Sequence, residues 1–295
     1  MNAPAPIFTD VRTLLETSRP RPRLDWLGYV AVIAFVSLMA IPMLADHSGQ
    51  MRQSVETLVS HLFLLLIGGM VLNNYFQARA MRAEMARLEA AEELVQLRRW
   101  PQAAMLLQSV LSRPARSPLA RLQGLVCFCG VAARFHRFDD VLAITDNLLE
   151  ELPLDAMGSH MVKLTRAMAL LREDRLFDAD RAISDLRRFP QAAESGGLAL
   201  VELYRDVKTG HPAEGLEIFD KRREVIRRQL GHRVADSYVL AAKAHDLLGQ
   251  TEQAKAAYES ATLLSPVVEL HRRYPETADL AAKYAPAPPP AEVMR

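Results

Sequence analysis

The sequence predicts an all-α protein in which a two-helix transmembrane hairpin is followed by a solenoid of about five helix pairs. Two observations lead to this prediction. Two long apolar runs lie near the N-terminus, Trp26–Ala45 and Thr57–Phe76, and behind them small and bulky residues recur at a nearly constant spacing. The expected domains are a polar N-terminal segment (1–25), the hairpin (26–76), a helical repeat domain (77–285) and a proline-rich tail (286–295) that cannot pack and should be disordered.

The polar N-terminal segment contains prolines at positions 4, 6, 20 and 22. Between them, the residues from Thr9 to Leu15 suit the start of a short amphipathic helix. We expect this helix to lie on the membrane surface.

The two apolar runs have the length and composition of membrane-spanning helices. About 20 residues at a rise of about 1.5 Å cross a hydrocarbon core of about 30 Å. Neither run contains Asp, Glu, Lys or Arg, each of which costs about 2.5–3.5 kcal/mol at the centre of a span. A cleaved signal peptide is the alternative for the first run, but Met43 stands where a cleavage site needs a small residue.

The arginines predict the orientation of the hairpin. They precede the first run and follow the second, whereas the loop at residues 46–56 has only Arg52. By the positive-inside rule, the N-terminus and the repeat domain are expected in the cytoplasm, with the loop outside. Abundant Arg, Ala and Leu suggest a bacterial source, so the predicted location is a bacterial inner membrane. No Gly or Pro interrupts residues 77–99, so the second span should continue into the domain as one helix.

An internal repeat organises the rest of the chain. Each helix pair has one anchor residue in its second helix, and the gaps between successive anchors are 38, 38, 36 and 39 residues; the anchors are Ala103, Val141, Ala179, Gly215 and Ala254. Twelve residues earlier stand mostly small residues, namely Ala91, Cys129, Ala167, Leu203 and Ala242. Small residues let paired helices approach, and prolines after four of the five anchors end the units. Such self-similarity indicates a helical solenoid.

The fifth unit resembles the tetratricopeptide-repeat (TPR) family. Its aromatic, small, turn and proline positions hold the residues typical of that family, namely Tyr238, Ala241, Ala242, Gly249, Ala254, Tyr258, Ala261 and Pro266. The resemblance extends over residues 83–266, although the spacing exceeds the family's usual 34 residues and units one to three lack the aromatics. It implies an array of helix hairpins whose first helices line a concave groove.

The composition argues against nucleic-acid binding and against catalysis. The chain has 36 basic and 35 acidic residues, which leaves no strongly basic surface. No phosphate-binding, hydrolase or zinc-protease motif is present, so we expect no catalytic, cofactor or metal site. His136 lies near Asp139 and Asp140, but a solvated turn explains this group better than a metal site does. Cys127 and Cys129 are two residues apart on one helix and should not pair.

The expected groove positions lie 18, 15, 11 and 8 residues before each anchor. They predict a partner-binding groove that is apolar in units two to four, formed by Val126, Met161, Leu164, Met168, Leu200 and Tyr204. In unit five the groove becomes polar at Asp236, Lys243 and Asp246. The alternative is that these residues are ordinary core of a closed array.

The sequence therefore predicts a non-enzymatic, membrane-anchored, TPR-like scaffold or adaptor. It would bind an apolar or amphipathic segment of a partner protein on the cytoplasmic face of the membrane and contact lipid through its two spans. The alternative is an accessory or regulatory subunit of a membrane enzyme or transport complex that binds through the hairpin itself.

Overall fold

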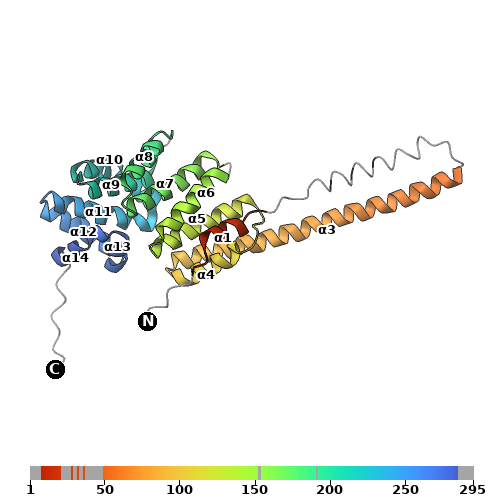
Figure 1. Ribbon diagram of the computed structural model, residues 1–295, viewed down its shortest axis with the longest axis horizontal. Helices are drawn as coiled ribbons and strands as arrows, with labels where there is room; N and C mark the ends of the chain where they lie inside the picture. The colour runs from red at the N-terminus through yellow and green to blue at the C-terminus, as the bar shows by residue number, and fades with distance from the viewer. Residues whose placement is uncertain are drawn as a thin grey trace, which may run out of the picture. The chain divides into compact units, whose positions relative to one another are not determined.

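A computed structural model describes residues 8–20, 28, 32, 36, 49–151, 154–190 and 192–284. Within these residues the chain is helical throughout, with thirteen α-helices, three short 3-10 helices and no strand (Figure 1). The helices pack in adjacent pairs, as expected for a helical repeat. The chain divides into two compact units, Met1–Val131 and Ala132–Arg295, which are considered separately below.

The predicted transmembrane hairpin is wrong, because no helix among the described residues is long and apolar enough to cross a membrane. The second run lies in α3 (Gly49–Gln96), where the polar residues Asn73 and Asn74 follow Leu72 and the charged Arg79 and Arg82 come soon after. A span needs about 20 apolar residues. The same finding overturns the predicted location in a bacterial inner membrane with the repeats in the cytoplasm. Most of the first run, and residues 286–295, lie outside the described residues.

In the first compact unit, residues that precede the apolar runs in the chain pack against residues that follow them. Helix α1 (Val11–Thr17) starts at Asp10, whose carboxylate accepts a hydrogen bond from the Thr13 amide. Its apolar face is buried against α4 (Trp100–Leu111), and Thr17 donates to the carbonyl of Leu111 at 3.0 Å. The predicted short helix therefore exists, but its apolar side is covered by the unit.

Helix α3 is continuous over 48 residues, close to the prediction that one helix runs to Arg99. Of the side chains that the structure describes between Leu64 and Phe76, the large apolar ones are exposed, whereas Leu88 and Ala91 are fully buried. The helix ends at Gln96, and Arg98 then takes a left-handed conformation with φ of 59°. Helix α5 (Pro118–Arg134) follows α4.

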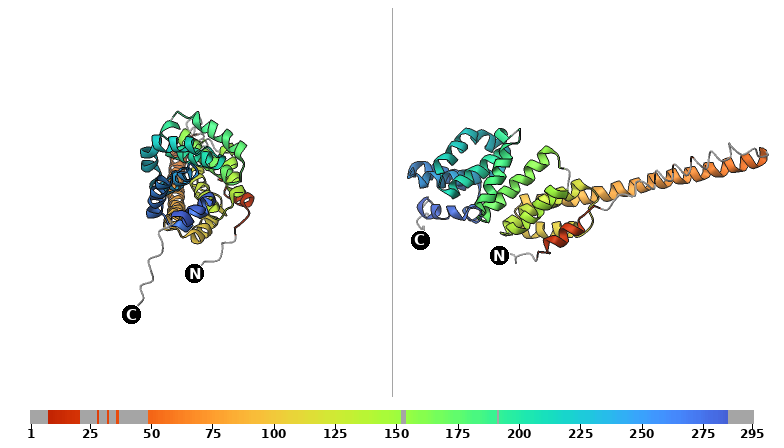
Figure 2. Two further views of the ribbon diagram at one scale, coloured as in Figure 1. Left: turned by 90° about the vertical axis from the view of Figure 1, so that its left-hand side faces the viewer. Right: turned by 45° about the horizontal axis from the view of Figure 1, so that its top comes forward.

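The second unit consists of successive helices of which each packs on its neighbour in the chain (Figure 2). They are α6 (Phe138–Glu151), α7 (Ala156–Arg172), α8 (Leu176–Arg187), η1 (Ala192–Glu194), α9 (Gly196–Thr209), α10 (Pro212–Leu230), η2 (Gly231–Arg233), α11 (Val234–Leu247) and α12 (Thr251–Leu264). Three short elements end the unit, namely α13 (Val267–Arg273), η3 (Pro275–Thr277) and α14 (Asp279–Tyr284).

The turns within the helix pairs confirm the repeat register. Each turn contains one residue with positive φ, five residues before the predicted anchor: Arg98, His136, Asp174, Gly210 and Gly249. The next amide in each case donates to the carbonyl five residues back, at 2.8–3.0 Å. This is the hydrogen bond of a Schellman motif, which satisfies a free carbonyl at a helix end. The spacing of these turns, 38, 38, 36 and 39 residues, equals that of the anchors.

The predicted anchors and their partners are buried, as close packing of two helices requires. Ala103, Ala179 and Ala254 have no exposed surface, and neither do Ala167 and Ala242 in the facing helices. The fourth repeat unit reverses the sizes. The position twelve residues before its anchor holds the bulky Leu203 where the other units have a small residue, and the anchor itself is a glycine, Gly215. A Cβ at Gly215 would lie 3.2 Å from Leu203 Cδ1, so the glycine makes room for the leucine.

The non-glycine residues in these turns carry avoidable strain. A left-handed conformation costs an L-residue about 1 kcal/mol, which glycine does not pay. We predict that Arg98→Gly raises the free energy of unfolding by about 0.5–1 kcal/mol and that Gly249→Ala lowers it by a similar amount. Thermal melts followed by circular dichroism measure both. Arg99→Gly, at a φ of −85°, is the matched control and should lower stability. A lowered melting temperature for Arg98→Gly would contradict the assigned turn.

Candidate partner-binding surface

The predicted groove residues differ in exposure. On α7, Met161 is 45 % exposed, and Leu164 and Met168 are half-buried. On α9, Leu200 and Tyr204 are buried. Leu164 packs on α9 at Gly197, where a Cβ would lie only 2.8 Å from Leu164 Cδ1. Val126 is half-buried on α5 and lies in the first of the two compact units, Met1–Val131.

The chain's own C-terminal residues explain why part of the predicted groove is covered. Residues 267–284, which we call the C-terminal segment, lie against α7, α9 and α11 through the side-chain contacts described below. We call the whole side of these three helices on which the segment lies the inner surface; the segment covers only part of it. The groove predicted from the sequence lies on the first helices of the pairs, and α7, α9 and α11 are such helices.

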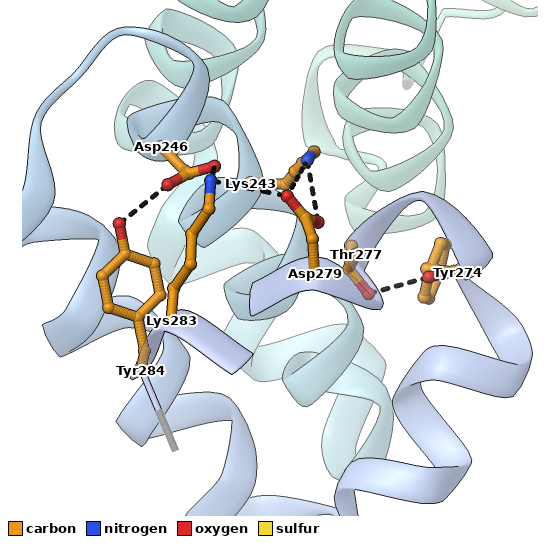
Figure 3. Close-up of polar contacts among 7 residues, drawn as sticks. All are labelled: Lys243, Asp246, Tyr274, Thr277, Asp279, Lys283 and Tyr284. Atoms are coloured by element: carbon orange, nitrogen blue, oxygen red, sulfur yellow. Dashed lines mark hydrogen bonds and ion pairs between the residues drawn. The ribbon is translucent and has the colours of Figure 1, made fainter. Parts of the chain in front are cut away.

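The local sequence shapes the C-terminal segment into two short helices joined by a turn. Three basic residues in the last turn of α13 suit the negative end of the helix dipole. Pro275 excludes a helical conformation at the preceding residue, and Tyr274 accordingly has φ of −133° and ψ of 78°. Thr277 closes the turn, because its hydroxyl donates to the Tyr274 carbonyl at 2.7 Å (Figure 3).

Tyr274 is the aromatic centre of the contact. It is fully buried and meets Tyr204 edge to face, with ring centroids 5.2 Å apart. The guanidinium carbon of Arg172 lies 4.5 Å from the Tyr274 ring centre and 5.2 Å from that of Tyr204. Both distances fall within the range of cation–π attraction. Arg172 Nε is buried without a hydrogen-bond partner, and the two aromatic rings lie against this cation.

Glu276, two residues later, meets a hydroxyl and an ammonium group. Tyr204 donates to Glu276 Oε1 at 2.9 Å, and Lys208 Nζ lies 3.2 Å from the same oxygen. Lys208 also donates to the Leu171 carbonyl at 2.6 Å, which fixes the ammonium group at the end of α7. Burial, and secondarily the charge of Glu276, raise the pKa of Tyr204, so its hydroxyl remains a donor. Burial also raises the pKa of Tyr274 to about 12.

The polar groove positions of unit five hold the remainder of the segment. Asp236 pairs with Arg273 at 2.5 Å, and Lys243 pairs with Asp279 at 2.8 Å. Asp246 accepts hydrogen bonds from Lys283 at 2.7 Å and from the Tyr284 hydroxyl at 2.8 Å, as Figure 3 shows. The charges of α11 thus alternate in the opposite sense to those of the segment. The opposite charges of the two stretches are present in the sequence. The spacing rule, however, predicts Asp236, Lys243 and Asp246 only as the polar end of the groove.

A cavity of about 410 Å³ on the other side of α9 is a weaker candidate site. Its lining is charged and formed by Arg187, Arg205, Asp206, Glu214, Glu217, Ile218, Lys221 and Arg222. The cations there already have partners, since Arg187 and Arg222 both pair with the buried Glu202, at 2.6 and 3.3 Å. Burial raises the pKa of Asp206, although the neighbouring Arg205 opposes that effect. The balanced charges indicate an ion-pair network.

Reactive and ligating side chains in the part of the chain that the structure describes were the remaining candidates for a site. Among the described residues, no three His, Cys, Asp or Glu side chains are arranged to hold a metal ion. Cys127 and Cys129 are free thiols; burial, together with Glu92, raises the pKa of Cys127 to about 11. His136 forms the left-handed turn before α6, and burial lowers its pKa.

No protein-family model, curated protein or solved structure matches this chain. The description of the helices as repeats therefore rests on the chain's own periodicity. The turn spacing and the buried anchors are independent observations of that periodicity, and they agree.

The ion pairs of the C-terminal segment predict an acid-sensitive attachment. Burial would raise the pKa of Asp246, but hydrogen bonds from Lys283 and Tyr284 outweigh it and lower the pKa below 3.8. The Lys243 ion pair likewise lowers the pKa of Asp279 against the effect of burial. Carboxylates with lowered pKa stabilise the folded state above the unfolded pKa, and this contribution is lost as the pH falls through the folded pKa.

We therefore predict that the melting temperature of the protein falls between about pH 5 and pH 3 more steeply than that of the Asp246→Asn/Asp279→Asn variant. Circular-dichroism melts across this range measure the difference. Parallel pH profiles for the two proteins would show that these carboxylates do not stabilise the fold through their charge.

Proposed function

We propose that this chain is a non-enzymatic scaffold or adaptor that binds a segment of a partner protein on its inner surface. The observation that carries the proposal is that this surface already holds a polypeptide. Residues 273–284 of the chain itself are held there by an aromatic contact, a cation–π contact and a row of ion pairs from α7, α9 and α11. These are the contacts by which proteins recognise short peptides.

The uncovered part of the inner surface supports the same function. Met161, Leu164 and Met168 share one face of α7, at spacings of three and four residues, and keep part of their surface exposed. Methionine adapts to partners of different shape, and such side chains are common at binding surfaces. A partner that contacts this face as well as the site of Tyr274 at Arg172 would span about three turns of α7.

We also propose that the helix pairs are TPR-like. The five left-handed turns and the small residues at the anchors support this proposal, together with the aromatic and proline positions of the fifth unit. TPR-like arrays bind peptides on the face formed by their first helices, which is the face that the C-terminal segment contacts here. The proposed function is thus a protein–protein interaction without a cofactor.

Site-specific photo-crosslinking in cells tests the proposed function. We predict that a photo-reactive amino acid at Met161 and at Met168 captures the same partner protein, identified by mass spectrometry, because both side chains face the inner surface. The matched control is Phe177, an 82 % exposed side chain on the second helix of the same pair. Capture of that protein from Phe177 as well, or no common protein from the two α7 positions, would contradict the proposal.

A further inference from the structure

We propose that the C-terminal segment is a displaceable self-ligand, and that the partner is a peptide presenting an aromatic ring followed two residues later by a carboxylate. This inference rests on the proposed function, since it names the partner of the same inner surface. The recognised features are those of Tyr274 and Glu276. The aromatic ring would bind between Arg172 and Tyr204, and the carboxylate would bind the Tyr204 hydroxyl and Lys208.

The structure of the C-terminal segment resembles that of a peptide bound to the helices more than that of another repeat unit. Its helices are seven and six residues long, well below the length at which a helix is stable alone, so its order depends on docking. Its two helices are shorter than those of the repeat pairs, and the turn between them has no left-handed residue of the kind that marks the five repeat units. Its contacts reach back beyond the last pair to α7, about 100 residues earlier in the chain, at Arg172.

Part of the attachment, at Asp279 and Lys283, consists of ion pairs near solvent, which exchange readily with those of a competing peptide. In the ion pairs to α11, Lys283 and Asp279 of the segment are 48 % and 44 % exposed, whereas their partners Asp246 and Lys243 are 10 % and 15 % exposed. Exposed ion pairs contribute little to stability. The buried contribution is concentrated in a few side chains: Leu270, Tyr274, Thr277, Leu280 and Tyr284. Val268, in contrast, is 76 % exposed.

A tethered ligand sets a threshold for any partner. Because α13 directly follows α12, the effective concentration of the segment at the inner surface is on the order of millimolar. A free peptide with equal contacts competes poorly at micromolar concentration. A partner overcomes this threshold with contacts that the segment does not make, and the exposed Met161 offers such contacts. Weakening the segment should therefore strengthen binding in trans, because apparent affinity scales with the fraction of open molecules.

Asp246 allows the segment to be loosened without touching the proposed peptide site. It holds Lys283 and Tyr284, which lie outside the stretch 272–279. The probe is a fluorescein-labelled peptide of residues 272–279, RRYPETAD, added to the full chain and followed by fluorescence anisotropy. Asp246→Ala should bind it at least about tenfold more tightly than the unmodified chain does. The matched control is Asp178→Ala, which removes the exposed pair with Arg175 on α8 and should change nothing.

The peptide sequence is tested on the same protein. In the Asp246→Ala background, peptides carrying Tyr274→Ala or Glu276→Gln should lose at least about tenfold in affinity, and adding Arg172→Ala to the protein should weaken the original peptide similarly. If Asp246→Ala does not fold, Lys283→Ala loosens the same contact from the segment's side. Equal or undetectable peptide binding to the unmodified, loosened and control proteins would overturn the inference.

Hydrogen exchange on the unmodified chain gives a second, variant-free readout. Amides of residues 270–284 should exchange at least about tenfold faster than the central amides of α11, since the segment detaches without unfolding the helices beneath it. Exchange of both at one common rate would overturn the inference. The self-ligand inference can fail while the proposed function stands. If a partner is crosslinked at Met161 and Met168 but the peptide does not bind, the chain is still a scaffold, and its ligand has another chemistry.

Discussion

The close approach of two helices within each pair is the constraint on which the rest of the structure depends. Small residues at the anchors permit it, and a left-handed residue five positions earlier turns the chain so that the second helix returns along the first. Gly215 shows how strict this constraint is, because it compensates for the bulky Leu203 at the facing position. Once pairs form in this way, their first helices present one continuous set of side chains in the second unit.

The inner surface is a consequence of that geometry. Arg172, Tyr204 and Lys208 stand near the C-terminal ends of α7 and α9, where they meet Tyr274 and Glu276. Further along, the charges of α11 meet those of α14. The surface thus combines a specific aromatic contact at one end with weaker ionic contacts at the other. A ligand bound in this way can be specific in sequence and still reversible, as a scaffold requires.

The periodic part of the fold was predictable from sequence, and the non-periodic part was not. Anchor spacing located the helix pairs, because two helices that are neighbours in the chain can pack closely only where small residues such as Ala179 and Ala254 stand at fixed positions. The apolar runs were read as two spans, but no described helix is apolar over a sufficient length. Among the groove residues, Met161 is exposed and Tyr204 is buried. No periodic rule predicts that difference, since Tyr204 is covered by a segment about 70 residues away in the chain.

The central claim of this account is that Tyr274 is held on the inner surface by Arg172. A double-mutant cycle with Arg172→Ala, Tyr274→Ala and the double variant measures that interaction through the free energies of unfolding. The account predicts a coupling of about 1 kcal/mol or more, as expected for a largely buried cation–π contact. Two substitutions whose effects simply add, with a coupling near zero, would contradict it.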